Sequence, residues 1–280
     1  MKKIYLFLLI LISMVSTVNT ARAGWPIGKY RNLVIPSFNY YTSKDTWDQN
    51  GDKIKGKPGA GFTSYSFGLY AGYGITRRLD AIVNVLYPMQ YSAYRDGSNN
   101  LVKQNSQGLG DLQAGLSYNL FNFGYTSFLS VMGSAIIPLY DTTKTVALGY
   151  ASYGAELKLM YSGAIDKSWL KGYYNLEVGY RRYFADQGPN VIIYTASMGV
   201  PLGRRNQMSV ELSGQNSYSI NKSFNPNLAV NRDYRFTKGA LNYGHTFTRR
   251  FSVFLSGFYT FTGRNTGQGY GGSVQSIFKL

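Results

Sequence analysis

Apolar and polar side chains alternate along most of this chain with a period of two, which is the hydrophobic pattern of β-strands. In the run 62–75 the odd positions carry Thr63, Tyr65, Phe67, Leu69, Ala71, Tyr73 and Ile75, and the even positions carry Ser64, Ser66, Gly68, Tyr70, Gly72 and Gly74. A soluble sandwich also alternates, but its outward face is the polar one and its buried face seldom carries so many aromatic residues. We therefore interpret the apolar parity as a face turned toward lipid.

The same reading divides the chain into strands joined by connections of alternating length. We predict strands at 29–43, 62–75, 79–93, 108–121, 126–139, 150–163, 171–185, 191–202, 207–219, 235–247, 251–263 and 270–280, with ends uncertain by about two to four residues. The long connections are 44–61, 94–107, 140–149 and 220–234, and the tight ones are 76–78, 122–125, 164–170, 203–206 and 248–250. Long loops are expected outside the cell and short turns in the periplasm. The segments 186–190 and 264–269 are short for outer loops, so a merged pair giving ten strands stays open.

This pattern predicts an all-β fold, a transmembrane antiparallel up-and-down β-barrel of about 12 strands, within a range of 10 to 14. An even strand count places both ends of the barrel in the periplasm and the protein in the bacterial outer membrane. After Gly24, every apolar run is interrupted within a few residues, so a helical membrane protein is excluded.

The N-terminus has the layout of a secretory signal. Lys2 and Lys3 form a basic start, Ile4 to Ile12 is apolar, and Ala21-Arg22-Ala23 fits a cleavage site. We predict a cleaved signal peptide at 1–23 and a barrel domain at 24–280. The alternative is an uncleaved membrane anchor. However, a spanning helix needs about 20 residues, and this apolar run is shorter.

Composition agrees with a barrel and leaves little for catalysis. The chain holds 26 Tyr, 16 Phe and 32 Gly, and only 15% of its residues are charged. Tyr and Phe are enriched where barrel strands cross the membrane interfaces. With no cysteine and the single His245, we expect no enzyme and no cofactor. The open alternative, an outer-membrane lipid hydrolase, needs a nucleophile beside His245, which we place outward in the periplasmic aromatic belt with no Ser or Asp at a catalytic spacing.

The charge is strongly positive. Without Lys2, Lys3 and Arg22, 26 basic residues face 13 acidic ones, a net charge of +13. The export signal argues against nucleic acid as the partner. We expect the basic residues to meet the phosphates of outer-membrane lipid and lipopolysaccharide, and to help attract anionic solutes. Three arginine pairs, Arg77-Arg78, Arg204-Arg205 and Arg249-Arg250, fall in predicted periplasmic turns, where they suit lipid headgroups.

The last strand ends in an alternating face made of Tyr270, Gly272, Val274, Ser276, Phe278 and Leu280. It resembles the terminal signal by which the barrel-assembly machinery recognises its clients, and we expect that machinery as a partner. Such signals commonly end in Phe, whereas here Phe278 stands two residues before Leu280.

The segment Tyr73-Gly74-Ile75-Thr76-Arg77-Arg78-Leu79-Asp80, followed by Gly108-Leu109-Gly110-Asp111-Leu112, resembles turn and strand-start motifs of a broad outer-membrane family. That family is named for the meta-pathway of phenol degradation and is loosely related to fatty-acid and aromatic-hydrocarbon channels. The resemblance covers roughly 24–280 and implies a barrel that passes small hydrophobic or aromatic molecules. The hydrocarbon channels carry an N-terminal plug, whereas only a handful of residues precede the first strand here, so the resemblance does not extend to a plugged mechanism.

The parity opposite the lipid face holds the candidate solute-binding residues. These lumen residues are Asp80, Asn84, Asp111, Gln113, Glu156, Lys158, Glu177, Arg181, Glu211 and Lys238. Both signs are present, so one interpretation is a side-chain network that fills the barrel. We favour a narrow passage for passive uptake, because small Ser and Gly residues between them leave room.

Two further interpretations concern the loops. A barrel that transports nothing could bind a partner or lipid through 44–61 and 220–234, with Trp47 and Phe224 as exposed aromatic anchors. The same two residues could equally fold back into the barrel mouth and constrict it. Oxygen ligands at alternate positions of Asp48-Gln49-Asn50-Gly51-Asp52 suggest a calcium loop. However, Lys53 and Gly59 stand where that loop needs Gly and Glu, so we expect an exposed turn and no metal.

Overall fold

The computed structural model describes residues 25–140, 143, 146–222 and 231–280. The predicted signal peptide and Phe224 therefore lie outside the described residues. Among the described residues, no helix has the length and apolarity that crossing a membrane would require.

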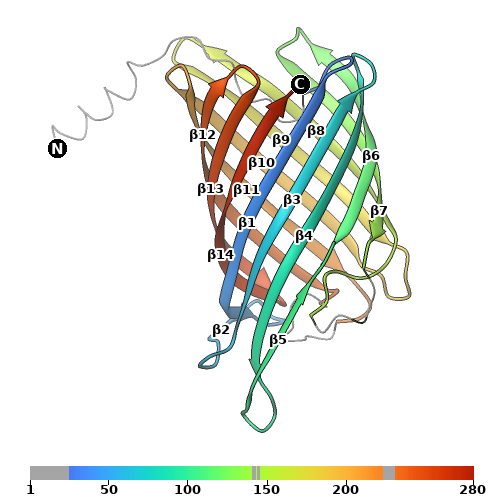
Figure 1. Cartoon of the computed structure of the whole chain (residues 1–280), viewed down its shortest axis with the longest axis vertical. Helices are drawn as coiled ribbons and strands as arrows, with labels where there is room; N and C mark the ends of the chain where they lie inside the picture. Colours follow the sequence, from blue (N-terminus) through green and yellow to red (C-terminus); the bar gives the residue numbers. More distant parts are fainter. Residues whose placement is uncertain (1–24, 141–142, 144–145, 223–230) are drawn as a thin grey trace, which may run out of the picture.

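Twelve long strands form one closed antiparallel barrel, which confirms the predicted fold class and excludes the ten-strand alternative. The ring consists of β1 (Asn32–Trp47), β3 (Gly61–Gly74), β4 (Leu79–Arg95), β6 (Asp111–Phe123), β7 (Ser127–Pro138), β8 (Gly154–Lys167), β9 (Leu170–Tyr183), β10 (Asn190–Leu202), β11 (Asn206–Tyr218), β12 (Tyr234–Thr248), β13 (Phe251–Arg264) and β14 (Thr266–Lys279). Each strand pairs with the next one in the ring, and β14 pairs with β1 to close it. The strands tilt strongly around the axis (Figure 1).

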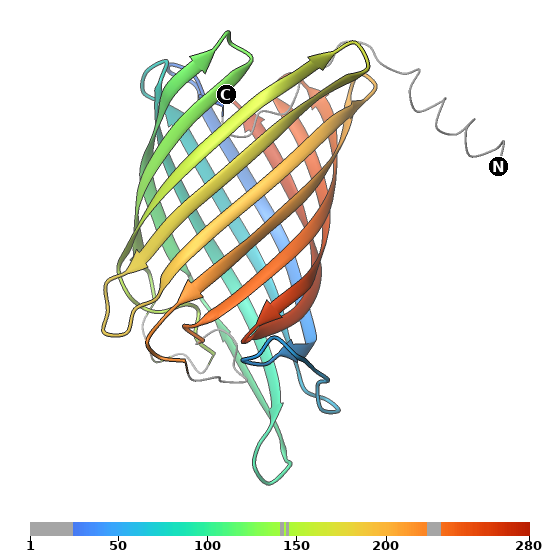
Figure 2. The same ribbon diagram turned by 180° about the vertical axis from the view of Figure 1, so that it is seen from behind.

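Two short strands lie outside this ring. β2 (Lys53–Ile54) pairs with the end of β1, and β5 (Leu101–Gln107) pairs with the end of β4. Both belong to segments that we predicted to be loops, and they project as hairpins from the end of the barrel opposite the C-terminus (Figures 1 and 2). Their end carries the long connections and is the extracellular one.

Two predicted connections are shorter in the structure than in the prediction. The segment 264–269 is almost wholly strand, because β13 runs to Arg264 and β14 begins at Thr266. β13 and β14 pair with each other only up to Tyr259 and Tyr270; beyond that point β13 continues along β12 and β14 along β1, and Asn265, with a φ of 50°, joins them. Likewise, 164–167 continues in register against β9, which satisfies backbone groups that a loop would leave open.

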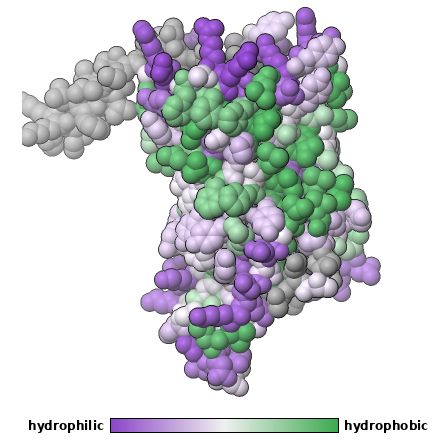
Figure 3. Space-filling model, viewed as in Figure 1, coloured by the Kyte–Doolittle hydropathy of each residue, from purple (hydrophilic) through white to green (hydrophobic). Residues whose placement is uncertain are grey.

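The outward parity exposes large apolar side chains on strands all around the ring, and Figure 3 shows them gathered on one face; we call this surface the apolar belt. Phe67, Leu159 and Val210 are 55%, 44% and 54% exposed although each lies near the middle of a strand. A water-soluble protein rarely exposes a contiguous apolar surface of this extent. The belt and the closed ring make this chain an outer-membrane β-barrel protein.

The lumen is less polar than we predicted in its periplasmic half. Ile82, Met132 and Met160 point inward from β4, β7 and β8 and form a buried apolar cluster, with Tyr70 packed against it. The prediction failed here because single apolar residues on the lumen parity do not disturb the overall alternation.

Residues before β1 pack into this periplasmic half. The Ile27 backbone N–H donates to Asp80 Oδ2 at 3.1 Å, and the Trp25 ring lies 4.7 Å from the Phe128 ring, centroid to centroid. A Cβ on Gly72 would lie 2.4 Å from Ile27 Cδ1, so the glycine makes room for this side chain. The handful of residues before the first strand is thus long enough to occupy part of the lumen.

Candidate functional site

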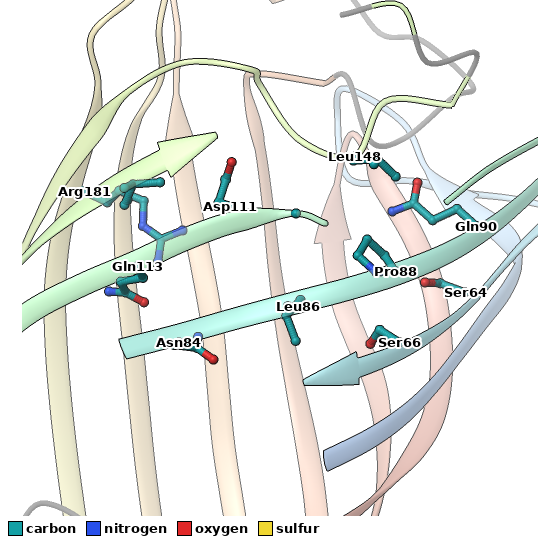
Figure 4. A pocket seen from close by; sticks show the side chains of 12 residues that line it. Ser64, Ser66, Asn84, Leu86, Pro88, Gln90, Asp111, Gln113, Leu148 and Arg181 are labelled. Carbon is teal, nitrogen blue, oxygen red and sulfur yellow. The ribbon is translucent and has the colours of Figure 1, made fainter. Parts of the chain in front are cut away.

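The extracellular half of the lumen contains a cavity of about 340 Å³ (Figure 4). Three neighbouring strands, β3, β4 and β6, supply most of its wall, and single residues enter from β7, β9 and the loop after β7. The lining residues are Ser64, Ser66, Asn84, Leu86, Pro88, Gln90, Gly110, Asp111, Gln113, Ile136, Leu148 and Arg181. One part of the wall thus offers amides and hydroxyls, and another part offers aliphatic side chains.

A network of ion pairs lies behind this cavity on β8 and β9. Arg181 donates to Glu156 Oε2 through Nε at 2.8 Å and through Nη2 at 2.6 Å. Lys158 Nζ lies 3.6 Å from Glu156 and 3.3 Å from Glu177. Two cations and two anions therefore compensate one another, so this wall is polar without a large net charge.

The amide side chains of the cavity wall differ in whether their hydrogen-bonding atoms have partners. Gln113 Nε2 donates to Ser134 Oγ at 2.8 Å. Gln90 Oε1, in contrast, is buried and accepts no hydrogen bond within the described part of the chain. A buried acceptor without a donor costs free energy, so Gln90 favours a ligand or water that donates a hydrogen bond.

Described residues of the connection between β7 and β8 reach into the barrel mouth and cover the cavity. Tyr140 donates through its hydroxyl to Asp111 Oδ1 at 2.9 Å and accepts from the Ala151 backbone N–H at 3.1 Å. The Val146 backbone N–H donates to Ser106 Oγ at 2.9 Å, and the Val146 side chain is fully buried. We had predicted 140–149 as an outer loop, whereas Tyr140, Val146 and Leu148 from this segment turn into the barrel mouth.

Replacing Tyr140 with Phe should loosen this cap. The change removes the donor to Asp111 and the acceptor for Ala151, at a cost of about 1–2 kcal/mol. Hydrogen exchange at the Ala151 amide should become faster, while the Gly115 amide in the middle of β6 serves as the control. Burial raises the pKa of the Tyr140 phenol above its ordinary value of 10.0, so in the wild type the cap should persist at a pH where an exposed tyrosine ionises. Unchanged Ala151 exchange in the variant would contradict this role.

The structure brings some of the candidate residues together and separates others. Asn84, Asp111, Gln113 and Arg181 line the cavity, and Glu156, Lys158 and Glu177 form the network behind it. Asp80 instead lies at the periplasmic end, where it holds the Ile27 backbone. Glu211 and Lys238 are not in the cavity wall: Glu211 accepts from Ser213 at 2.8 Å, and Lys238 lies over the Phe258 ring.

The prediction that Trp47 is an exposed surface anchor is wrong, because this side chain is only 6% exposed. Its ring fills the space over Gly263, where a Cβ would lie 2.4 Å from a ring carbon. An isolated tryptophan beside a polar loop gives no sequence signal for such a recess. The surface-binding alternative thereby loses one of its two anchors, and the other, Phe224, lies outside the described residues.

Two alternatives remain, the calcium loop at Asp48 and the hydrolase centred on His245, and both residues make local hydrogen bonds. Asp48 Oδ1 accepts the backbone N–H groups of Asn50 and Asp52, each at 2.8 Å, so the suggested calcium loop is a turn capped by its own carboxylate. His245 faces outward and its Nδ1 lies 2.6 Å from Asn206 Oδ1, with the imidazole stacked edge-on against Phe247.

No family model and no curated protein matches the sequence. The fold does match solved structures. An outer-membrane channel from Pseudomonas putida F1 aligns over 94% of this chain and 100% of its own, with a TM-score of 0.69 and 13% identity. The NanC porin aligns over 88% of this chain and 100% of its own, with a TM-score of 0.50 and 10% identity. These likenesses show that the chain shares the barrel fold of outer-membrane proteins.

Proposed function

We propose that this barrel is a channel for passive uptake of small molecules that are hydrophobic or aromatic and carry a hydrogen-bonding group. The observation that carries the proposal is the cavity in the lumen. Its aliphatic residues Leu86, Ile136 and Leu148 face a solute together with amides and hydroxyls of β3, β4 and β6. Ligand sites for small molecules generally combine an apolar lining with a few placed polar groups. The resemblance to the phenol-pathway family and the shared fold with solved channels support the same function.

The ion-pair network fits an uncharged or weakly charged solute in this cavity. Because Arg181 is held by Glu156, its guanidinium is largely compensated. Gln90 lines the cavity, and its buried Oε1 would gain a donor if the side chain turned toward a hydroxyl or amine of the solute. A phenol-like molecule matches both parts of the wall.

Passage toward the periplasm leads through the apolar cluster of Ile82, Met132 and Met160. Methionine has a flexible side chain without branching, so it adapts to neighbouring groups more easily than the other apolar residues. We propose that these methionines move aside for a solute, which limits the channel to small molecules.

Reconstitution of the mature protein into liposomes tests this function. Liposomes should swell in isosmotic glycine or arabinose and stay unchanged in raffinose, because the methionine cluster occupies part of the lumen on the way to the periplasm. In planar bilayers, phenol added to the extracellular side should reduce the ion current as it occupies the cavity. An absence of swelling in every small solute, with correctly folded barrels, would overturn the proposal.

The residues before β1 should restrict this flux. Replacing Trp25 and Ile27 together by Ala removes the two side chains that pack on Phe128 and over Gly72. We expect a higher single-channel conductance and faster swelling in arabinose. Tyr30, which is 67% exposed, provides the matched control as Tyr30→Ala, which should leave conductance unchanged. Equal conductance of the double variant and the wild type would show that these side chains do not obstruct the passage.

A further inference from the structure

A second group of lumen side chains lies outside the cavity, on the wall formed by β13, β14, β1 and β3. Tyr41, Phe62 and Phe258 all project inward there, and we name these three residues the aromatic platform. The rings of Tyr41 and Phe258 are 6.3 Å apart with an interplanar angle of 15°, and the rings of Tyr41 and Phe62 are 6.0 Å apart at 61°. All three side chains remain partly exposed to the lumen.

Glycines on β14 allow these rings to lie against the wall. A Cβ on Gly269 would lie 2.1 Å from the Tyr41 ring, and one on Gly271 would lie 2.8 Å from Phe258 Cζ. Glycine weakens a strand, and within a strand it often marks the close approach of another group. The rings of Tyr41 and Phe258 therefore lie close against the backbone of β14.

Lys238 supplies a positive charge at the edge of the aromatic platform. Its Nζ lies 4.9 Å from the centroid of the Phe258 ring. Within the described part of the chain Lys238 has no carboxylate within ion-pair distance, whereas Lys158 has two. A lumen cation that contacts only an aromatic face keeps much of its capacity to bind an anion.

The aromatic platform borders the cavity already described. Phe62 shares the inward face of β3 with Ser64 and Ser66, which line the cavity. A solute entering from the extracellular mouth therefore passes between a hydrogen-bonding wall and an aromatic wall that carries a cation.

We propose that the aromatic platform and Lys238 form a stacking subsite for planar aromatic carboxylates. The ring of such a solute stacks on Tyr41 and Phe258, and its carboxylate takes the Lys238 ammonium from the face of Phe258. The subsite lies outside the compensated cavity, on the wall that carries Lys238, and adds aromatic carboxylates to the uncharged solutes of that cavity; it rests on the proposed function. Stacking and the charge contact are each expected to change affinity by about threefold to tenfold.

Equilibrium dialysis of the detergent-solubilised mature protein against radiolabelled benzoate measures the subsite directly. Benzyl alcohol, which lacks the charge, and cyclohexanecarboxylate, which lacks the aromatic ring, serve as competitors. Benzoate should bind about threefold to tenfold more tightly than either one. Lys238→Met should abolish the preference over benzyl alcohol, and Phe258→Leu should abolish the preference over cyclohexanecarboxylate.

Two matched variants control for nonspecific effects. Lys103→Met removes a lysine from the β5 hairpin, and Tyr259→Leu removes an aromatic ring from the lipid face of β13; both should bind benzoate as the wild type does. If Phe258→Leu does not fold, as judged by the heat-dependent shift in gel migration, Phe62→Leu replaces it. Benzoate affinity equal to that of both competitors, or a preference that survives Lys238→Met, would overturn the subsite.

The same preparations separate this inference from the proposed function. Liposomes that swell in arabinose while the protein shows no benzoate preference would leave the channel standing and reject the subsite. Benzoate binding with the expected variant pattern, but without any solute flux, would support the subsite and reject the channel.

Discussion

Replacing Glu156 by Gln is expected to lower the free energy of unfolding of the barrel by about 3 kcal/mol. The Glu156 side chain is fully buried and compensates Arg181 at 2.6 Å and Lys158 at 3.6 Å. Gln keeps the shape and removes the charge, so two cations remain with the single carboxylate of Glu177. This loss of stability is at the low end of the range for breaking a buried ion pair. Arg181 and Lys158 are 23% and 20% exposed, so water screens their charges in part.

Urea-induced unfolding in lipid vesicles, followed by tryptophan fluorescence, measures this loss. Glu211→Gln is the matched control, since Glu211 also lies on the lumen side but contacts the neutral Ser213, and it should cost less than about 1 kcal/mol. The double variant Glu156→Leu with Arg181→Met should recover part of the stability, because an unpaired ion is costlier than no ion. Similar losses for Glu156→Gln and Glu211→Gln would contradict the compensating role of Glu156.

Leu159→Arg should destabilise the barrel by about 2–4 kcal/mol, because it places a charge near the middle of the membrane. Leu159 lies midway along β8, is 44% exposed and pairs with Val131 and Val178 on the lipid-facing side. Arginine there must either lose its hydration or draw water and headgroups into the bilayer. The same vesicle unfolding measurement applies, together with the yield of folded protein in the outer membrane.

Phe123→Arg supplies the comparison for depth. Phe123 is the last residue of β6, at the periplasmic edge, and is 51% exposed. A charge at the interface should cost only about 0–1 kcal/mol. If both arginine variants lose the same stability, the apolar belt does not mark the membrane at this height.

Most of the fold could be predicted from the sequence because barrel strands alternate strictly between two different environments. Each parity assignment, such as Phe67 outward and Ser66 inward, repeats over a whole strand and corrects for single exceptions. Strand ends were harder to predict, since pairing continues beyond the bilayer, where both faces of the strand are polar. Asp45 and Thr46 illustrate this: they look like loop residues, yet their backbones pair with β14.

The candidate site was predicted only in part. The parity rule identified Asn84, Asp111, Gln113 and Arg181, because their position depends on local alternation alone. It did not find Leu148, which reaches the lumen from a loop, or the contact of Ile27 with Asp80. These contacts depend on how non-local segments fold back into the barrel, and no periodic pattern encodes that.

The seam between β1 and β14 makes completion of the barrel an all-or-none event. The backbones of Asn32 and Leu280 exchange two hydrogen bonds of 2.9 Å, so the residue directly after β14 is bonded to the start of β1. A polypeptide that stopped before β14 would leave two strand edges without partners in a solvent that offers none. β14 must therefore be in place against β1 before the barrel is stable in the bilayer.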